Sequence, residues 1–184
     1  MSIPDVFHRI TTKLDHAGIA YMLTGAFASA HYGSPRSTQD IDFVIAATPE
    51  QLRSLVNTLE SAEYYAELQE ALEAQRRQSL FNIIDLRSGW KIDLIFRKSR
   101  PFSQEEFSRR QPARVEGVDI YLASAEDVII AKLEWPKLGN SQRQIEDAAA
   151  ILRLKRDALD QTYLEKWISE LGLQQQWRTA NQRV

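Results

Sequence analysis

The 184-residue sequence contains no cysteine and only three histidines, His8, His16 and His31. The absence of cysteine excludes disulfides, thiolate catalysis and zinc–thiolate sites, and the three histidines have no spacing that suits zinc. We expect His31 to be packed or to face solvent. Any metal site in this chain must therefore be built from oxygen ligands.

The sequence also lacks a long hydrophobic run and a leader pattern. No apolar segment approaches the roughly 20 residues that span a bilayer, and the segment Met1–Asp5 lacks the basic and then apolar order of a signal peptide. We therefore expect a cytoplasmic protein without membrane contact. A hydrophobic content of 43% over this length predicts one folded unit with one substantial core.

An excess of charge of one sign is missing as well. The formal net charge of -2 argues against a generic electrostatic grip on nucleic acid, which usually requires a strongly basic domain. Local basic clusters occur at 97–100 and at Arg109 and Arg110. They could line a cleft for a polyanion, but charge runs are more often solvated, and we favour that interpretation.

The spacing of the apolar residues predicts a mixed α/β (α+β) fold, with a central sheet flanked by helices and a helical C-terminal third. Helices are expected at 6–14, from a Thr48 cap to about 61, at 102–110, and from a Ser124 cap to Trp135, where Pro136 and Gly139 end it. Strands are expected at 19–23, 40–46, 79–86, 90–96 and 115–122, the last with a turn or bulge at Gly117. The segment 63–78 is either a second helix or a flexible excursion, and the pattern beyond Asn140 is helical. We expect a catalytic core at 1–123 and a helical region packed on it at 124–184.

Two aspartates are placed for metal binding in the expected strand 40–46. Side chains two residues apart in a strand point to the same face, so Asp40 and Asp42 are neighbours while Ile41 and Phe43 point into the core. Adjacent carboxylates repel each other unless a cation lies between them. Mg²⁺ commonly binds one or two carboxylates together with substrate phosphates. Asp93, in the second arm of an expected hairpin, is costly to bury alone and is the natural third ligand.

These residues resemble the polymerase-beta-like nucleotidyltransferase superfamily, in particular its small bacterial members of the abortive-infection and toxin–antitoxin type. The resemblance rests on the turn 24–26, the pair Asp40-Ile41-Asp42 and the later Asp93, which follow in the family's order over about residues 19 to 96. The segment 124–127, followed by Lys132, Arg143 and Asp147, resembles the helix pair after the family's catalytic core. Ala26 departs from the Gly or Ser that is usual there, so a serine hydroxyl contact to phosphate is missing.

The resemblance implies roles for particular residues. Asp40 and Asp42 would hold Mg²⁺ (or Mn²⁺) at the triphosphate, and Asp93 would share a second metal or act as the base toward an acceptor hydroxyl. The nucleotide-binding residues would be Gly25, Ala26, Arg36, Thr38 and Lys132. Three of these have equally plausible structural roles: Arg36 in a surface ion pair, Thr38 as a loop cap and Lys132 as a solvated lysine.

The function that this resemblance implies is a Mg²⁺-dependent transfer of a nucleoside monophosphate from an NTP to an unidentified acceptor, which is RNA, a protein or a small molecule. The resemblance also allows a place in a toxin–antitoxin or phage-defence system. The alternative is a catalytically weak binding module or antitoxin that pairs with a partner protein, for which an apolar face of Trp167, Ile168 and Leu171 would be suitable. Apolar C-terminal helices could also form a homodimer. We expect Trp135, Trp167 and Trp177 to be core or interface residues.

Overall fold

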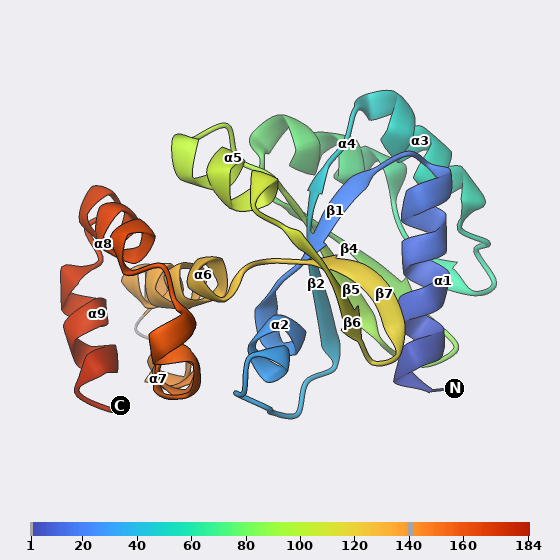
Figure 1. Cartoon of the computed structure of the whole chain (residues 1–184). Helices are drawn as coiled ribbons and strands as arrows, with labels where there is room; N and C mark the ends of the chain where they lie inside the picture. Colours follow the sequence, from blue (N-terminus) through green and yellow to red (C-terminus); the bar gives the residue numbers. More distant parts are fainter. Residues whose placement is uncertain (1, 140–141) are drawn as a thin grey trace.

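The computed structural model describes residues 2–139 and 142–184, so the predictions that fall on Met1 and Asn140 lie outside the described residues (Figure 1). The strands are β1 (Ala20–Leu23), β2 (Asp40–Ala46), β3 (Tyr64–Tyr65), β4 (Leu80–Asp85), β5 (Lys91–Phe96), β6 (Gln111–Val115) and β7 (Val118–Leu122). The helices are α1 (Ile3–His16), α2 (Gly25–His31), α3 (Pro49–Thr58), α4 (Leu68–Arg77), α5 (Pro101–Ser108), α6 (Ala125–Gly139), α7 (Gln142–Lys155), α8 (Gln161–Glu170) and α9 (Gln174–Asn181), with a 3-10 turn at Arg156–Ala158. The mixed α/β fold class is confirmed.

All seven strands form one sheet in the order β3-β4-β5-β2-β1-β7-β6. The central strand β2 runs antiparallel to β1 and parallel to β5, and β1 is parallel to β7. The predicted hairpin of 79–86 and 90–96 is present as the antiparallel pair β4 and β5. The strand that carries Asp40 and Asp42 therefore lies beside the strand that carries Asp93.

Two helices of the N-terminal half, α1 and α3, start at side-chain caps. Thr48 and Gln51 form a capping box with Pro49 at the first helical position of α3, as predicted. The opening helix α1 also begins at a capping box, formed by Ser2 and Asp5. Because each cap satisfies backbone N–H groups at the helix start, both helices begin at defined residues.

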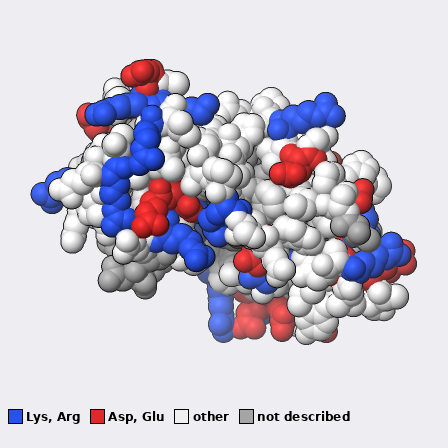
Figure 2. Space-filling model, turned by 90° about the horizontal axis from the view of Figure 1, so that it is seen from below, with Lys and Arg blue, Asp and Glu red and all other residues white. Residues whose placement is uncertain are grey.

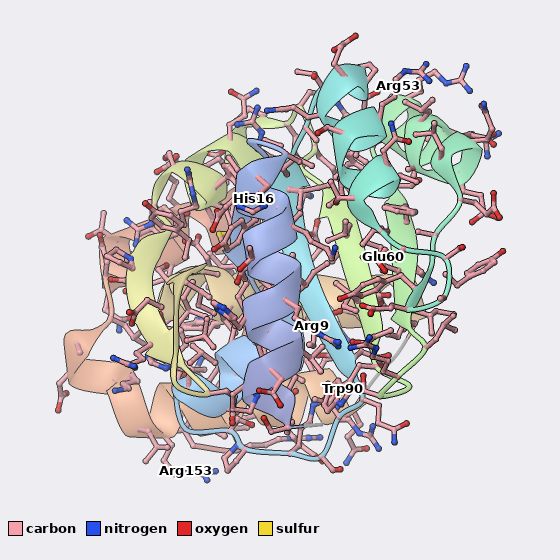
Figure 3. All side chains as sticks on the ribbon, turned by 90° about the vertical axis from the view of Figure 1, so that its right-hand side faces the viewer. Arg9, His16, Arg53, Glu60, Trp90 and Arg153 are labelled. Carbon is pink, nitrogen blue, oxygen red and sulfur yellow. The ribbon has the colours of Figure 1, made fainter. Side chains whose placement is uncertain are left out.

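Two layers of helices cover the sheet. Figure 1 shows α1, α3 and α4 on one side, and α2 with α6 to α9 on the other. Figure 3 shows α1 lying across the first of these faces, with Arg9 pointing toward the end of the sheet where Trp90 lies. Arg9 donates a hydrogen bond to the fully buried Asp85. Ile41 and Phe43 are fully buried on one face of β2. Asp40 and Asp42 therefore point to the other face of the sheet.

The segment 111–122 corrects one prediction. A single strand was expected at 115–122, but the structure has a hairpin of β6 and β7. Glu116 and Gly117 both have positive φ, 49° and 78°, which is the backbone of a tight two-residue hairpin turn. Pro112 argued against a strand in the sequence, because proline fits a strand only where its missing N–H is not needed. This condition is met in β6, which is the last strand in the sheet order.

Two further predictions differ from the structure. Helix α6 continues through Pro136 and ends at Gly139. The proline removes one backbone hydrogen-bond donor, but the packing of α6 against α7 keeps the segment helical. The segment 63–78, for which a helix and a flexible excursion were the two alternatives, contains the helix α4 and also the two-residue strand β3, which pairs with β4. So short a strand has no readable pattern of its own.

Helix α8 buries two of its apolar residues within the chain. Trp167 is 3% exposed, and its ring centroid lies 5.2 Å from that of Phe102 in α5. Ile168 is also buried. Two of the three residues of the apolar face that was expected to suit a partner are therefore covered by the chain itself, whereas Leu171 is only partly buried. Within the described residues, no helix has the length and apolarity needed to cross a membrane.

Candidate active site

The three predicted carboxylates lie on two adjacent strands. In the parallel pairing of β2 with β5, Asp42 is the register partner of Asp93, and Asp40 is the partner of Lys91. Alternation along both strands directs these side chains to the face opposite Ile41 and Ile92, which are fully buried. The structure thus brings together Asp40, Asp42 and Asp93, residues that are far apart in the sequence.

The turn between β1 and α2 lies directly against Asp42. The Thr24 N–H donates to the Asp42 carbonyl oxygen at 2.9 Å, which ties the end of β1 to β2. Gly25 has φ of +66°, and a Cβ atom placed on it would lie 1.9 Å from Asp42 Oδ2. The Ala26 backbone N–H donates to the Asp42 carboxylate. The glycine is therefore needed both for its left-handed backbone and for the close approach of α2 to the acid.

Lys91 lies between two of the carboxylates. Its Nζ atom is 3.2 Å from Asp40 Oδ1 and 3.1 Å from Asp93 Oδ2. Both carboxylates raise the pKa of the ammonium against the opposing effect of its desolvation. Because the ammonium offsets the repulsion between the two acids, Lys91 supplies a positive charge where a metal ion would otherwise supply it.

The electrostatics of the acids suit a hard cation. Burial raises the pKa of Asp42, and the nearby Asp93 and Asp40 raise it further. Burial also raises the pKa of Asp93, although Lys91 opposes this shift. Asp93 Oδ1 is buried and has no hydrogen-bond partner among residues 2–139 and 142–184. A divalent ion would satisfy this oxygen and relieve the repulsion, so the donor set fits Mg²⁺ or Mn²⁺.

As they are placed, no three Asp, Glu or His side chains of the described residues form a ready metal-binding group. The side chain of Asp40 is about half exposed (49%), whereas that of Asp93 is 12% exposed, and both face the Lys91 ammonium. A metal that binds all three aspartates would therefore have to displace Lys91 from at least one of them.

Arg36 and Lys132 share one acidic partner, Asp147 on α7. The Lys132 ammonium lies 2.8 Å from Asp147 Oδ2, and Arg36 Nε lies 3.4 Å from the same oxygen. The Ser34 hydroxyl donates to the other carboxylate oxygen at 3.1 Å. Lys132 is 5% exposed, so the alternative of a solvated lysine is wrong. For Arg36 the structural alternative was a surface ion pair with an acid. Arg36 does pair with an acid, Asp147, but this acid is buried and does not lie on the surface.

The remaining predicted residue, Thr38, lies in the loop just before β2. Its hydroxyl accepts a hydrogen bond from the Asp40 N–H at 3.1 Å, so it has the loop-cap role. It also lines the same cavity as the aspartates. His31 was expected either to be packed or to face solvent, and it is exposed.

A cavity of about 420 Å³ joins these groups. Its lining includes every predicted site residue except Ala26, whose contact to Asp42 is through the backbone: Gly25, Arg36, Thr38, Asp40, Asp42, Asp93 and Lys132. The cavity continues past Ile95 and Phe96 to α5 and α6, where it is lined by Arg97, Lys98, Arg100, Phe102, Ser103, Glu106, Val128, Ala131, Glu134 and Trp135. The basic cluster 97–100 is thus part of the wall of this cavity.

The face of the molecule shown in Figure 2 has no large area of one sign. On the face shown in Figure 2, basic and acidic side chains are interspersed over a mostly uncharged surface. Within the basic clusters, Arg100 forms a bidentate pair with Glu134, and Arg109 pairs with Glu126 at 3.3 Å.

A second cavity, of about 470 Å³, lies away from the carboxylates. Its lining is Tyr32, Arg109, Gln111, Ser124, Ala125, Glu126, Lys155, Ala158 and Leu159. None of the predicted site residues lines it. The cavity that contains the aspartates is therefore the candidate active site.

One family of known proteins matches this chain over most of its length. Residues 19–183 match the family described as "Nucleotidyltransferase of unknown function (DUF6036)", and the chain belongs to this nucleotidyltransferase family. The match covers the carboxylate strands and the C-terminal helices together. Among curated proteins, none matches the sequence significantly.

Solved structures show the same fold at low sequence identity. An antigenic nucleotidyltransferase-like protein from Paracoccidioides brasiliensis is similar with a TM-score of 0.59 and 17% identity, over 96% of this chain and 91% of that one. ANT(2'')-Ia, in complex with adenylyl-2''-tobramycin, is similar with a TM-score of 0.57 and 14% identity, over 91% of this chain and 95% of that one. The nucleotidyltransferase-like fold is thus found over nearly the whole chain.

Proposed function

We propose that this protein is a divalent-metal-dependent nucleotidyltransferase that transfers a nucleoside monophosphate from an NTP to a hydroxyl group of an acceptor. The observation that carries the proposal is the register of β2 with β5, which pairs Asp42 with Asp93 beside the Gly25 turn. The acceptor would be RNA, a protein or a small molecule, and the proposed compartment is the cytoplasm. We also propose that 1–123 form the catalytic core and that 124–184 form the helical region packed on it.

In this proposal the chain's own residues hold the triphosphate and the ions. Asp40, Asp42 and Asp93 would bind Mg²⁺ or Mn²⁺, which when bound supplies positive charge to the phosphate oxygens. The start of α2 would present the N–H groups of Gly25 and Ala26, and Lys132 and Arg36 would add positive charge from the opposite wall. Thr38 would keep the Asp40 end of β2 in place.

The proposed reaction is an in-line displacement at the α-phosphorus. The acceptor hydroxyl oxygen forms a bond to the α-phosphorus, while the bond from that phosphorus to the bridging oxygen breaks and pyrophosphate leaves with the electron pair. Where Asp93 serves as the base instead of as a metal ligand, the hydroxyl proton passes to it, and the burial that raises its pKa favours that role. The protein's contribution is mainly to position the two reactants.

The test is transfer of label from α-phosphate-labelled ATP, CTP, GTP and UTP, with Mg²⁺, to RNA, protein and small-molecule fractions. The wild type is compared with the Asp40→Asn, Asp42→Asn double variant, and with Asp119→Asn as a control for an exposed aspartate. We expect label with the wild type and the control only. Label in none of the fractions, from any of the four nucleotides, would contradict the proposal.

A second candidate is a binding module or antitoxin that acts by pairing with a partner toxin or antitoxin protein. Two observations favour it: Ala26 lacks a hydroxyl, and Lys91 pairs with Asp40 and Asp93. If the double aspartate variant keeps the biological effect of the wild type, this candidate is correct. A homodimer fits either candidate and is measured by sedimentation.

A further inference from the structure

Glu106, on α5, is a buried acid that the proposed reaction does not use. Its side chain lines the cavity of the aspartates, and the residue is 7% exposed. Within residues 2–139 and 142–184 it has no hydrogen bond and no ion pair, although burying a polar group without a partner is costly. An unpartnered carboxyl that faces a cavity indicates a ligand that would complete its hydrogen bonds.

The basic side chain with the largest effect on Glu106, Arg100, does not serve as its partner. Arg100 donates to Glu134 Oε2 at 2.6 Å and to the Ser103 hydroxyl at 3.0 Å. The guanidinium is therefore already used, and Arg100 only partly offsets the effect of burial on Glu106. Burial raises the pKa of Glu106 to about 8, with Asp127 adding to the shift. At neutral pH the group is mostly an uncharged carboxylic acid, which has one O–H donor and one C=O acceptor.

The wall around Glu106 combines aromatic and apolar side chains with charged and polar ones. The cavity beyond β5 is lined by Phe102, Val128, Ala131 and Trp135 together with Arg97, Lys98, Arg100, Ser103 and Glu134, and Trp135 is 60% exposed. Every nucleobase can stack on an aromatic ring, and its polar edge suits the polar part of this wall. Glu106 supplies the hydrogen bonding that such a pocket needs for selectivity.

The distance from the aspartates suits a nucleotide. The three residues from Asp93 to Phe96 span roughly 10 Å along β5, and the cavity continues from there to α5. A nucleoside attached to phosphates at Asp40 and Asp42 would extend toward α5. The ligand group that meets Glu106 is thus the base of the same NTP.

We propose that Glu106 recognises the nucleobase, donating to the basic ring nitrogen and accepting from the adjacent amino group of adenine or cytosine. This inference rests on the proposed function. Guanine presents two N–H donors at the corresponding edge and would require the ionised carboxylate. Uracil presents no basic ring nitrogen there. The protein is therefore selective for ATP, CTP or both.

The experiment measures binding of non-hydrolysable analogues of ATP, CTP, GTP and UTP, with Mg²⁺, by titration calorimetry. The wild type is compared with Glu106→Leu, which removes both hydrogen-bonding groups, and Glu106→Gln, which keeps one donor and one acceptor. Glu105→Gln is the matched control, because Glu105 is the adjacent residue on α5 and pairs with Lys166 away from the cavity. Circular dichroism of each variant checks the fold.

We expect the wild type to prefer the ATP or CTP analogue. In Glu106→Leu that affinity falls about tenfold to a hundredfold, to the level of the GTP and UTP analogues. Glu106→Gln recovers most of the preference, and Glu105→Gln leaves it unchanged.

Equal loss for all four analogues, or no change in Glu106→Leu, would overturn the proposal while leaving the nucleotidyltransferase function standing. Unchanged nucleotide affinities with a changed set of labelled acceptors would assign Glu106 to the acceptor instead, and would also overturn it. A wild type that binds none of the four analogues would show that the proposed function itself has failed.

Discussion

Gly25 and Asp42 are in direct contact across the junction of α2 with the sheet. A Cβ atom on Gly25 would lie 1.9 Å from Asp42 Oδ2 and 2.5 Å from Asp42 Cγ, distances that no real structure tolerates. Asp42 is also held by the Ala26 N–H, which donates to its carboxylate. Asp42, the central acid of the site, can therefore lie at this position only because Gly25 has no side chain.

Gly25→Ala should displace Asp42 and disrupt the metal site. The methyl group would force the carboxylate away, and the φ of +66° adds a strain of about 1 kcal/mol for any residue with a Cβ. We expect a loss of Mn²⁺ binding by at least about tenfold, measured by electron paramagnetic resonance of free Mn²⁺, and a loss of nucleotidyl transfer.

Gly89→Ala is the matched control for this substitution. Gly89 has a similar φ of +74°, but a Cβ there would meet nothing within 4 Å. It should cost about as much backbone strain and leave Mn²⁺ binding intact. Equal Mn²⁺ binding by Gly25→Ala and Gly89→Ala would show that the close contact with Asp42 is not important for the site.

The parts of the site that follow a local pattern could be predicted from the sequence. Asp40 and Asp42 share a face because strand residues alternate, and Ile41 and Phe43 are buried as that alternation requires. The hairpin that contains Asp93 follows from two β-rich runs around a short turn. The predicted capping of α3 by Thr48 is likewise local, and the structure has it.

The parts that depend on long-range pairing could not be predicted. Lys91 meets Asp40 only because β2 and β5 are parallel neighbours in one particular register. Asp147 meets Lys132 only because α6 packs against α7. Glu106 has no sequence signal that separates it from the acids of a solvated helix. The sequence identifies such residues as charged, whereas their burial and partners are properties of the tertiary structure.

Lys91→Met should strengthen the binding of divalent cations. The Lys91 ammonium competes for oxygens of Asp40 and Asp93, which it approaches at 3.2 and 3.1 Å. Because partly exposed ion pairs contribute only about 1 kcal/mol or less, we expect a gain of up to about fivefold in Mn²⁺ affinity.

Two controls accompany this measurement. Lys91→Arg keeps the charge and should leave the Mn²⁺ affinity close to that of the wild type. Lys98→Met removes a charge from the far part of the same cavity and should have a smaller effect. Weaker Mn²⁺ binding by Lys91→Met would contradict competition and would instead assign Lys91 to holding the aspartates in place for the metal.

Glu106 should make the protein less stable as the pH rises. Its pKa is about 8 in the folded protein, against an ordinary value of 4.5, chiefly because of burial. Between these values the folded protein retains a proton that the unfolded chain has released, so the free energy of unfolding falls with increasing pH. The contribution between pH 5 and pH 7 is about 2 to 3 kcal/mol.

Glu106→Gln should remove this contribution. Denaturant unfolding at pH 5, 6 and 7 should show a smaller decline for Glu106→Gln than for the wild type, while Glu105→Gln should follow the wild type. Parallel curves for all three proteins would contradict a buried, uncharged Glu106. Burial also raises the pKa of Asp42 and Asp93, and their contribution to the decline should be common to the three proteins.

Asp147→Asn should destabilise the fold and weaken nucleotide binding together. Asp147 is the shared partner of Lys132 and Arg36 and accepts from Ser34. Without its charge, Lys132 is a buried cation that lacks a counter-ion, and burial already lowers the pKa of this lysine. Removing one member of a buried ion pair costs about 3 to 5 kcal/mol, and the amide of asparagine recovers part of this by accepting a hydrogen bond.

We therefore expect the free energy of unfolding of Asp147→Asn to fall by about 2 to 4 kcal/mol in denaturant titrations. The affinity for NTP should fall as well, because Lys132 loses part of its positive charge and its fixed position. Asp119→Asn breaks a pair with Arg114 whose side chains are 82% and 70% exposed, and it should change stability by less than about 0.5 kcal/mol.

If Asp147→Asn behaves like Asp119→Asn in stability yet lowers NTP affinity, Asp147 orients the cations without holding α6 to α7. If it lowers stability alone, Lys132 and Arg36 are structural residues and the phosphates are bound by the start of α2 and the metal ions.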